Sequence, residues 1–75
     1  MSTEVVLKNG GKINFRSVAT NVILEAIKQI SFHEEVGHIE FYVPHDDDQE
    51  ELRGTVLRFK GYHEFYNWHE ERLIL

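Results

Sequence analysis

The histidines are the first residues in this sequence that could support chemistry, because they number five in 75 residues. Two of them bracket the string HEEVGH at residues 33–38. A zinc-peptidase helix requires two histidines four residues apart, so that both imidazoles lie on one helical face with a glutamate between them. Here the two histidines are five residues apart and a glycine precedes the second, which favours a solvated loop. We therefore expect no metal and no cofactor, and a histidine-dependent metal enzyme is the last of three functional hypotheses.

A run of acidic residues occupies the segment PHDDDQEE, residues 44–51. Calcium-binding loops alternate their acidic ligands and place a glycine at the sharp turn, whereas this run contains three consecutive aspartates. An ordinary solvated loop is therefore the first interpretation, and a phosphate mimic that occupies a basic groove on a partner is the second. The acidic residues of this loop are Asp46, Asp47, Asp48, Glu50 and Glu51.

Nucleophilic catalysis has little support in the sequence. There is no cysteine, and no serine lies in a Gly-x-Ser-x-Gly elbow. The pair Gly10 and Gly11 lacks the continuation of a phosphate-binding loop, so a hairpin turn explains these glycines better. A chain of 75 residues also has little room for a deep pocket. We therefore expect a protein that is not an enzyme.

Aromatic residues form the most suggestive cluster, because tyrosine and tryptophan dominate binding hot spots. The alternative is that a small core recruits large side chains to fill itself. Trp68 and Tyr42 are the two aromatic residues that the expected core explains least, so they are our first candidates for a contact surface. The full set of candidate contact residues is Tyr42, Tyr62, Tyr66 and Trp68.

The net charge of −5 is distributed unevenly along the chain. Residues 1–32 carry four basic and two acidic side chains, whereas residues 33–75 carry four basic and eleven acidic ones. Since affinity for a phosphate backbone comes mainly from lysine and arginine, a direct nucleic-acid partner is not expected. The lack of cysteine suits a reducing cytosol, and the sequence shows neither a signal peptide nor a membrane span. We expect a cytoplasmic protein.

The element expected at the centre of the fold is a helix over residues 17–30, SVATNVILEAIKQI. At about 100° per residue, one sector of this helix collects apolar side chains, and Leu24 is the clear misfit. Ser17 is a suitable N-cap, because its hydroxyl can accept a hydrogen bond from a free amide of the first turn. The apolar sector consists of Ala19, Val22, Ile23, Ala26, Ile27 and Ile30, with Val18 at its rim.

A β-hairpin is expected before this helix, over residues 3–16. Asparagine and two glycines at residues 9–11 indicate a three-residue loop with a glycine bulge. That loop pairs Leu7 with Ile13, and it places Lys8 opposite Lys12 across the turn.

A second hairpin is expected after the helix, from residues 38–43 and 52–60. Pairing Phe41 with Leu57, and Ile39 with Phe59, gives a consistent antiparallel register in which Glu40 faces Arg58. Residues 62–72 show a helical pattern, although the aromatic residues also suit a short edge strand.

These elements predict a single small domain over residues 1–75, of the α+β class. We expect two antiparallel β-hairpins packed on a central amphipathic helix, in the order ββαββα, with a short helix or strand last. The leading functional hypothesis is a small non-enzymatic acidic module that binds another protein or itself, for instance as a homodimer, through an aromatic surface and a strand edge. It is not expected to bind nucleic acid directly or a membrane. The alternative is an acidic mimic of nucleic acid that inhibits a DNA- or RNA-binding protein.

Overall fold

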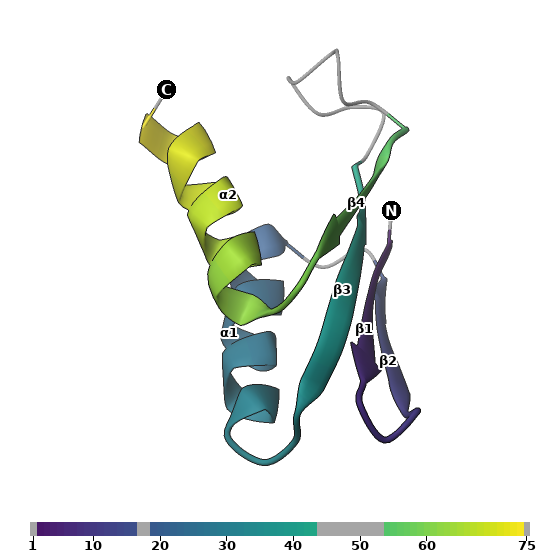
Figure 1. The fold of residues 1–75 in the computed structure, drawn as a ribbon. Coiled ribbons are helices and arrows are strands. Elements are labelled where there is room, and N and C mark those ends of the chain that lie inside the picture. Colours follow the sequence, from purple (N-terminus) through teal and green to yellow (C-terminus); the bar gives the residue numbers. More distant parts are fainter. Residues whose placement is uncertain (1, 17–18, 44–53, 75) are drawn as a thin grey trace.

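The computed structural model describes residues 2–16, 19–43 and 54–74 (Figure 1). It contains strands β1 (Ser2–Leu7) and β2 (Lys12–Arg16), helix α1 (Thr20–Ser31), strands β3 (Val36–Tyr42) and β4 (Val56–Phe59), and helix α2 (Tyr62–Ile74). The α+β class is therefore confirmed, and the last element is a helix. None of the helices in the described segments is long and apolar enough to cross a membrane.

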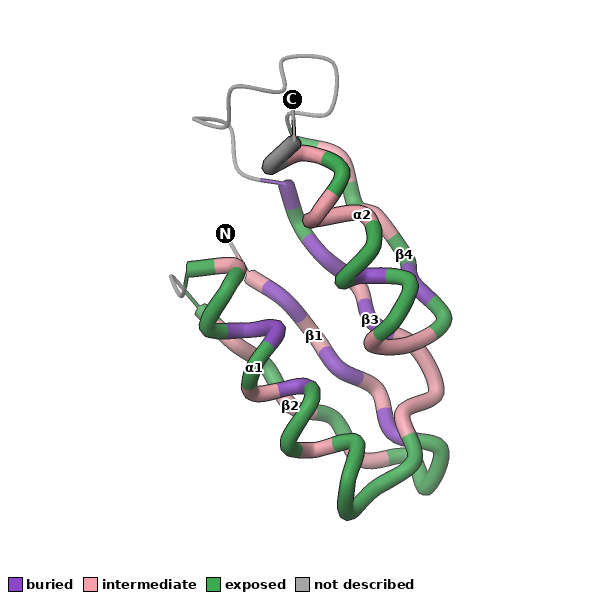
Figure 2. The backbone as a smooth tube through the Cα atoms, turned by 90° about the vertical axis from the view of Figure 1, so that its left-hand side faces the viewer, coloured by how far each residue is buried: buried purple, intermediate pink, exposed green. Residues whose placement is uncertain are grey.

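The strands form one antiparallel sheet in the order β2-β1-β3-β4. Both predicted hairpins are present in the predicted order ββαββα, but β1 also pairs with β3 and joins the hairpins into one sheet, which was not predicted. This pairing satisfies backbone groups of two strands that would otherwise be exposed edges. Both helices lie on one face of the sheet (Figure 1), with α2 over β3 and β4 and α1 over the side of β1 and β2 (Figure 2).

The first hairpin has the predicted type of turn in a different position. Val5 pairs with Ile13, so the predicted pairing of Leu7 with Ile13 is wrong. The loop is residues 8–10, because the amide of Gly10 donates to the carbonyl of Leu7 at 3.0 Å, and the amide of Leu7 donates to the carbonyl of Gly11 at 2.8 Å. Gly10 adopts φ 95°, the left-handed conformation that a glycine bulge requires. The displacement is two residues, which leaves every side chain on its predicted face.

The predicted repulsion between Lys8 and Lys12 is absent, because Lys12 pairs with Val6 in this register. Lys8 instead lies beside the segment that follows α1. Its amide donates to the carbonyl of Glu35 at 2.9 Å, and its Nζ lies 3.4 Å from Oε2 of the same residue. The tip of the first hairpin is thereby attached to the start of β3.

The second hairpin has the predicted register. Phe41 pairs with Leu57, Ile39 with Phe59, and Glu40 with Arg58. Its strands have other limits than expected, since β3 already begins at Val36 and β4 begins only at Val56. Gly54 adopts φ 72° and donates its amide to the carbonyl of Val43 at 3.1 Å, which places a turn before β4. The predicted start of this strand at residue 52 lies outside the described residues.

The core lies between the sheet and the two helices, and Figure 2 marks buried positions on both helices and on the strands. Alternate residues of β1 and β3 point into it, as a sheet with one covered face requires. Its buried hydrophobic residues are Val5, Leu7, Ile23, Leu24, Ile27, Ile39, Phe41, Val43, Phe59 and Phe65.

Helix α1 begins later than predicted, and its buried side includes Ile23 and Ile27 of the predicted sector but extends beyond that sector to Leu24. Its N-cap is Ala19, which makes no side-chain capping bond, and the predicted cap Ser17 lies outside the described residues. Leu24, the predicted misfit, is buried, whereas Val22 from the predicted apolar face is 53% exposed. The prediction treated the sheet as the only partner of this helix.

The burial of Leu24 follows from the position of α2 beside α1. Leu24, Lys28 and Ser31 are spaced i, i+4 and i+7, so they share one side of α1. Lys28 and Ser31 line a pocket together with Tyr62 of α2, which identifies that side as the one facing α2. Ile23 and Ile27 face the sheet, and Val22 is left on the opposite flank.

Candidate functional site

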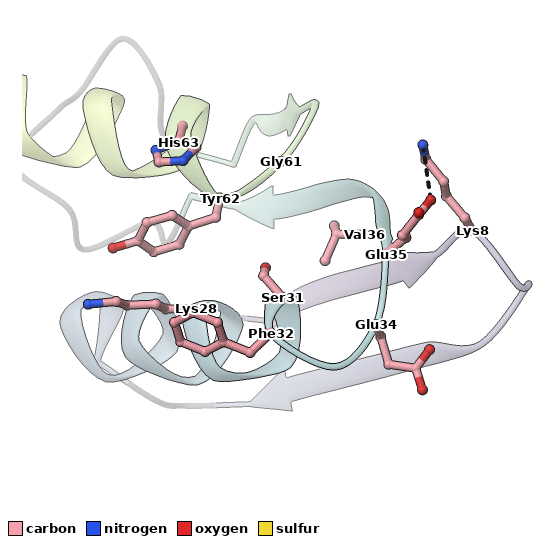
Figure 3. Close-up of a pocket in the computed structure, with 10 residues that line it drawn as sticks. All are labelled: Lys8, Lys28, Ser31, Phe32, Glu34, Glu35, Val36, Gly61, Tyr62 and His63. Atoms are coloured by element: carbon pink, nitrogen blue, oxygen red, sulfur yellow. Dashed lines mark ion pairs between the residues drawn. The ribbon is translucent and has the colours of Figure 1, made fainter.

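A pocket of about 530 Å³ lies where the end of α1 meets the start of α2 (Figure 3). One wall comes from the last turn and C-cap of α1, and the opposite wall comes from the first residues of α2. The segment before β3 and the tip of the first hairpin complete the rim. The lining residues on the two walls are Lys28, Ser31 and Phe32, and Gly61, Tyr62 and His63.

The wall from α1 exposes an aromatic ring because the helix ends immediately before it. Phe32 is the C-cap, and its amide donates to the carbonyl of Gln29 at 3.2 Å. The side chain of Phe32 therefore leaves the helix, and it is 70% exposed. Ser31 donates its hydroxyl to the carbonyl of Ile27 at 2.8 Å, so this hydroxyl is bonded within the helix and not to a base.

The opposite wall is set by the first turn of α2. The carbonyl of Gly61 accepts a hydrogen bond from the amide of Phe65 at 3.3 Å, and Tyr62 follows as the first helical residue. The ring of Tyr62 stacks on that of Tyr66, with centroids 5.7 Å apart and an angle of 28° between the rings. Tyr66 is 39% exposed, so an aromatic strip continues from the pocket along α2.

Charged side chains surround this aromatic centre. The ion pair of Lys8 with Glu35 lies on the rim, and exposed pairs of this kind contribute little to stability. Figure 3 shows the Nζ of Lys28 and the hydroxyl of Tyr62 reaching to the same side of the pocket. Within the described segments Lys28 forms no ion pair. The pocket therefore combines two aromatic walls with one cation that is available to a bound group.

The four predicted contact residues do not form one surface. Tyr62 and Tyr66 lie on α2 at the pocket and beside it. Tyr42 is 38% exposed on the open face of the sheet, where it pairs with Val56. Its outward orientation agrees with the strand pattern, but the sheet separates it from both helices.

Trp68 is half-buried and packs against the core, so the core explains more of this residue than predicted. Its ring lies 5.4 Å from that of Phe41 and 5.7 Å from that of Phe59, measured between centroids. The guanidinium of Arg72 lies over the Trp68 ring, 4.3 Å from its centre. The helical pattern of residues 62–72 did not predict these contacts, because the sequence does not show that α2 lies over β3 and β4.

Phe32, the most exposed of the large hydrophobic residues in the described segments, was absent from the predicted site. The only signal that could have found it is its position. An aromatic residue directly after the last turn of a helix lies beyond the apolar side of that helix, so the helix does not carry its ring into the core. The predicted helix ends at residue 30, one residue before the end of α1 at Ser31, but the sequence did not show that α2 would lie opposite this end.

The histidines are dispersed over the fold. His63 lines the pocket, His33 is exposed after α1, and His38 lies on the open face of the sheet. His38 Nε2 lies 3.1 Å from Nη2 of Arg58 and 3.3 Å from Oε1 of Glu40. Because arginine is always protonated, this nitrogen accepts a hydrogen bond from Arg58.

No group of three histidine, aspartate or glutamate side chains within residues 2–16, 19–43 and 54–74 is arranged to hold a metal ion. The acidic loop residues Asp46, Asp47, Asp48, Glu50 and Glu51 lie outside the described residues.

One titratable group near the pocket has a perturbed pKa. A hydrogen bond to Glu70, together with the negative charge of that carboxylate, raises the pKa of Tyr66 above its ordinary value. The phenol is protonated at neutral pH, as tyrosine ordinarily is, and it donates its hydrogen bond to Glu70.

Comparison with known proteins gives no family. No protein-family model, curated protein or solved structure matches this chain. Its function must therefore be inferred from the residues and geometry described above.

Proposed function

We propose that this protein is a small non-enzymatic interaction module that binds another protein at the pocket between α1 and α2. A partner inserts an apolar or aromatic side chain between Phe32 and Tyr62. The observation that carries this proposal is the Phe32 ring, 70% exposed on one wall of a pocket whose other wall is also aromatic.

The energetic reason is the apolar area that the free protein leaves in water. Burying a phenylalanine side chain fully contributes about 1.5–3 kcal/mol relative to its exposed state. The stacked rings of Tyr62 and Tyr66 add a rigid surface beside it, and rigid aromatic residues lose little side-chain entropy on binding. An aromatic pocket with a polar rim has the composition of an interface hot spot.

The experiment begins with a peptide selected from a random display library against the wild-type protein. Its Kd is then measured for the wild type, for Phe32→Ala and for Tyr42→Ala, with circular dichroism to verify folding. We expect Phe32→Ala to weaken binding by about 30-fold or more, the range of a hot-spot residue. Tyr42→Ala should leave the Kd unchanged, since Tyr42 lies on the other face of the sheet.

Selected peptides that bind Phe32→Ala as tightly as the wild type would contradict the proposal. If Tyr42→Ala weakens binding instead, the contact surface is the open face of the sheet.

Salt separates this proposal from the alternative of an acidic mimic of nucleic acid. Binding through apolar rings should change little between low and moderate ionic strength, whereas electrostatic mimicry should weaken steeply. Light scattering of the wild type and Phe32→Ala, at matched concentrations, tests whether the partner is a second copy of the chain.

A further inference from the structure

Among the residues that the structure describes, strand β2 is an edge of the sheet, and no backbone group pairs with its outer side. In an antiparallel ladder, alternate residues direct their N–H and C=O groups toward the neighbouring strand. Because Leu7 bonds to Gly11, the residues of β2 that bond to β1 are 11, 13 and 15. The peptide groups of Lys12, Asn14 and Arg16 therefore point away from the sheet.

The side chains of this edge alternate in charge and polarity. Lys12, Asn14 and Arg16 are exposed on the open face of the sheet, and Ile13 and Phe15 are half-buried on the face that the helices cover. Neither Lys12 nor Arg16 forms an ion pair with any residue that the structure describes. A cationic edge thus lies on a chain whose net charge is −5.

An apolar flank runs beside this edge. Helix α1 lies over the side of β1 and β2 (Figure 2), and its side with Leu24, Lys28 and Ser31 faces α2. Val22 and Ala26, four residues apart, lie on the opposite side of the helix, toward the β2 edge. Val22 is 53% exposed, so this side of the helix leaves apolar area uncovered.

A second copy of the chain is a poor occupant of this edge. Antiparallel pairing of β2 with itself about Asn14 would place Lys12 of each copy opposite Arg16 of the other, and like charges in that position are destabilising. A shift by one residue would direct apolar and charged side chains to the same face. The edge instead complements a strand with acidic residues opposite Lys12 and Arg16.

We propose that β2 binds an extended acidic segment of a partner protein, which joins the sheet as an antiparallel fifth strand. In this segment, apolar residues lie opposite Ile13 and Phe15, and acidic residues lie opposite Lys12 and Arg16. Backbone bonds to the peptide groups of Lys12, Asn14 and Arg16 hold the segment, and its apolar side chains cover the flank at Val22. This second surface is independent of the pocket at Phe32.

The probe is a short synthetic peptide in which valine alternates with glutamate, and its control has lysine in place of glutamate. Two-dimensional NMR of the labelled protein reports the site. We expect the glutamate peptide to shift the amides of Lys12, Asn14 and Arg16 and to slow their exchange with solvent. The lysine peptide should bind at least about ten-fold more weakly.

Two variants test the mechanism. Asn14→Pro removes an N–H that points away from the sheet and leaves the bonds to β1 in place. It should weaken binding of the glutamate peptide by about ten-fold or more. Lys12→Glu combined with Arg16→Glu should reverse the preference in favour of the lysine peptide. Phe32→Ala should bind the glutamate peptide as the wild type does, which separates this proposal from the one at the pocket.

The inference is overturned if the shifted amides belong to β4 or to the pocket, or if both peptides bind equally well. Should Asn14→Pro fail to fold, the charge-reversal variant decides, and an unchanged preference in that variant overturns the inference.

Discussion

Thr3 shows how one side chain can oppose the stability of this small core. It is 0% exposed, and its Oγ1 has no hydrogen-bond partner among the described residues. A buried hydroxyl without a partner costs about 1–3 kcal/mol, because it loses its bonds to water. Valine has nearly the same shape without the hydroxyl.

We expect Thr3→Val to raise the free energy of unfolding by about 1 kcal/mol, measured by urea denaturation. Thr3→Ser is the matched control, since it keeps the hydroxyl and removes a methyl group. That control should lower the free energy of unfolding by about 1 kcal/mol. A loss of stability in Thr3→Val would show that the hydroxyl has a bonding partner in solution.

Tyr66 provides a test by pH. The Glu70 carboxylate raises the pKa of this phenol, so the folded state holds the proton more tightly than the unfolded state does. The resulting stabilisation is present below the ordinary pKa of tyrosine and is lost as the pH rises through the raised pKa.

Spectrophotometric titration should therefore show one tyrosine that ionises at a higher pH than the others. This transition should be absent in Tyr66→Phe and should move to lower pH in Glu70→Gln. A titration curve in which Glu70→Gln changes nothing would contradict the assigned cause.

At the scale of the element, the first hairpin depends on the conformation of one glycine. Gly10 has φ 95°, and no atom lies within 4 Å of the position that a Cβ would occupy. The cost of a substitution there comes from backbone conformation and not from a clash.

We expect Gly10→Ala to lower the free energy of unfolding by about 1–2 kcal/mol, as measured by thermal or urea denaturation. Gly10→Asn should cost less, because asparagine tolerates the left-handed region. Equal effects of the two substitutions would argue against a left-handed residue at this turn.

At the scale of the molecule, the pairing of β1 with β3 connects the two halves of the chain. Each hairpin contributes one central strand of the sheet. Helix α1 covers the side of β1 and β2, and α2 covers the side of β3 and β4. Neither half can bury its apolar face alone, and a domain of this size has a stability of only about 5 kcal/mol.

We therefore expect cooperative unfolding in a single transition. The fluorescence of Trp68 reports contacts of α2 with β3 and β4, whereas far-ultraviolet circular dichroism reports all elements. Urea midpoints from the two signals should coincide. Separate midpoints would indicate that the half containing β1, β2 and α1 unfolds independently.

Local patterns in the sequence were sufficient for the class of fold, for the existence of each element and for the register of β3 with β4. That register is decided by cross-strand neighbours, since Phe41 with Leu57 and Glu40 with Arg58 agree with only one alignment. The turn of the first hairpin was predictable in type, because a glycine is needed at its left-handed position.

Only the tertiary structure decided which elements are neighbours. The order β2-β1-β3-β4, the position of α2 beside α1 and the contacts of Trp68 all join residues far apart in the chain. Amphipathic periodicity shows that a helix has an apolar side. Because α1 packs against both the sheet and α2, its buried side is wider than that apolar side and is rotated toward α2. The pocket at Phe32 exists for the same reason, because its walls belong to two helices that β3 and β4 separate in the chain.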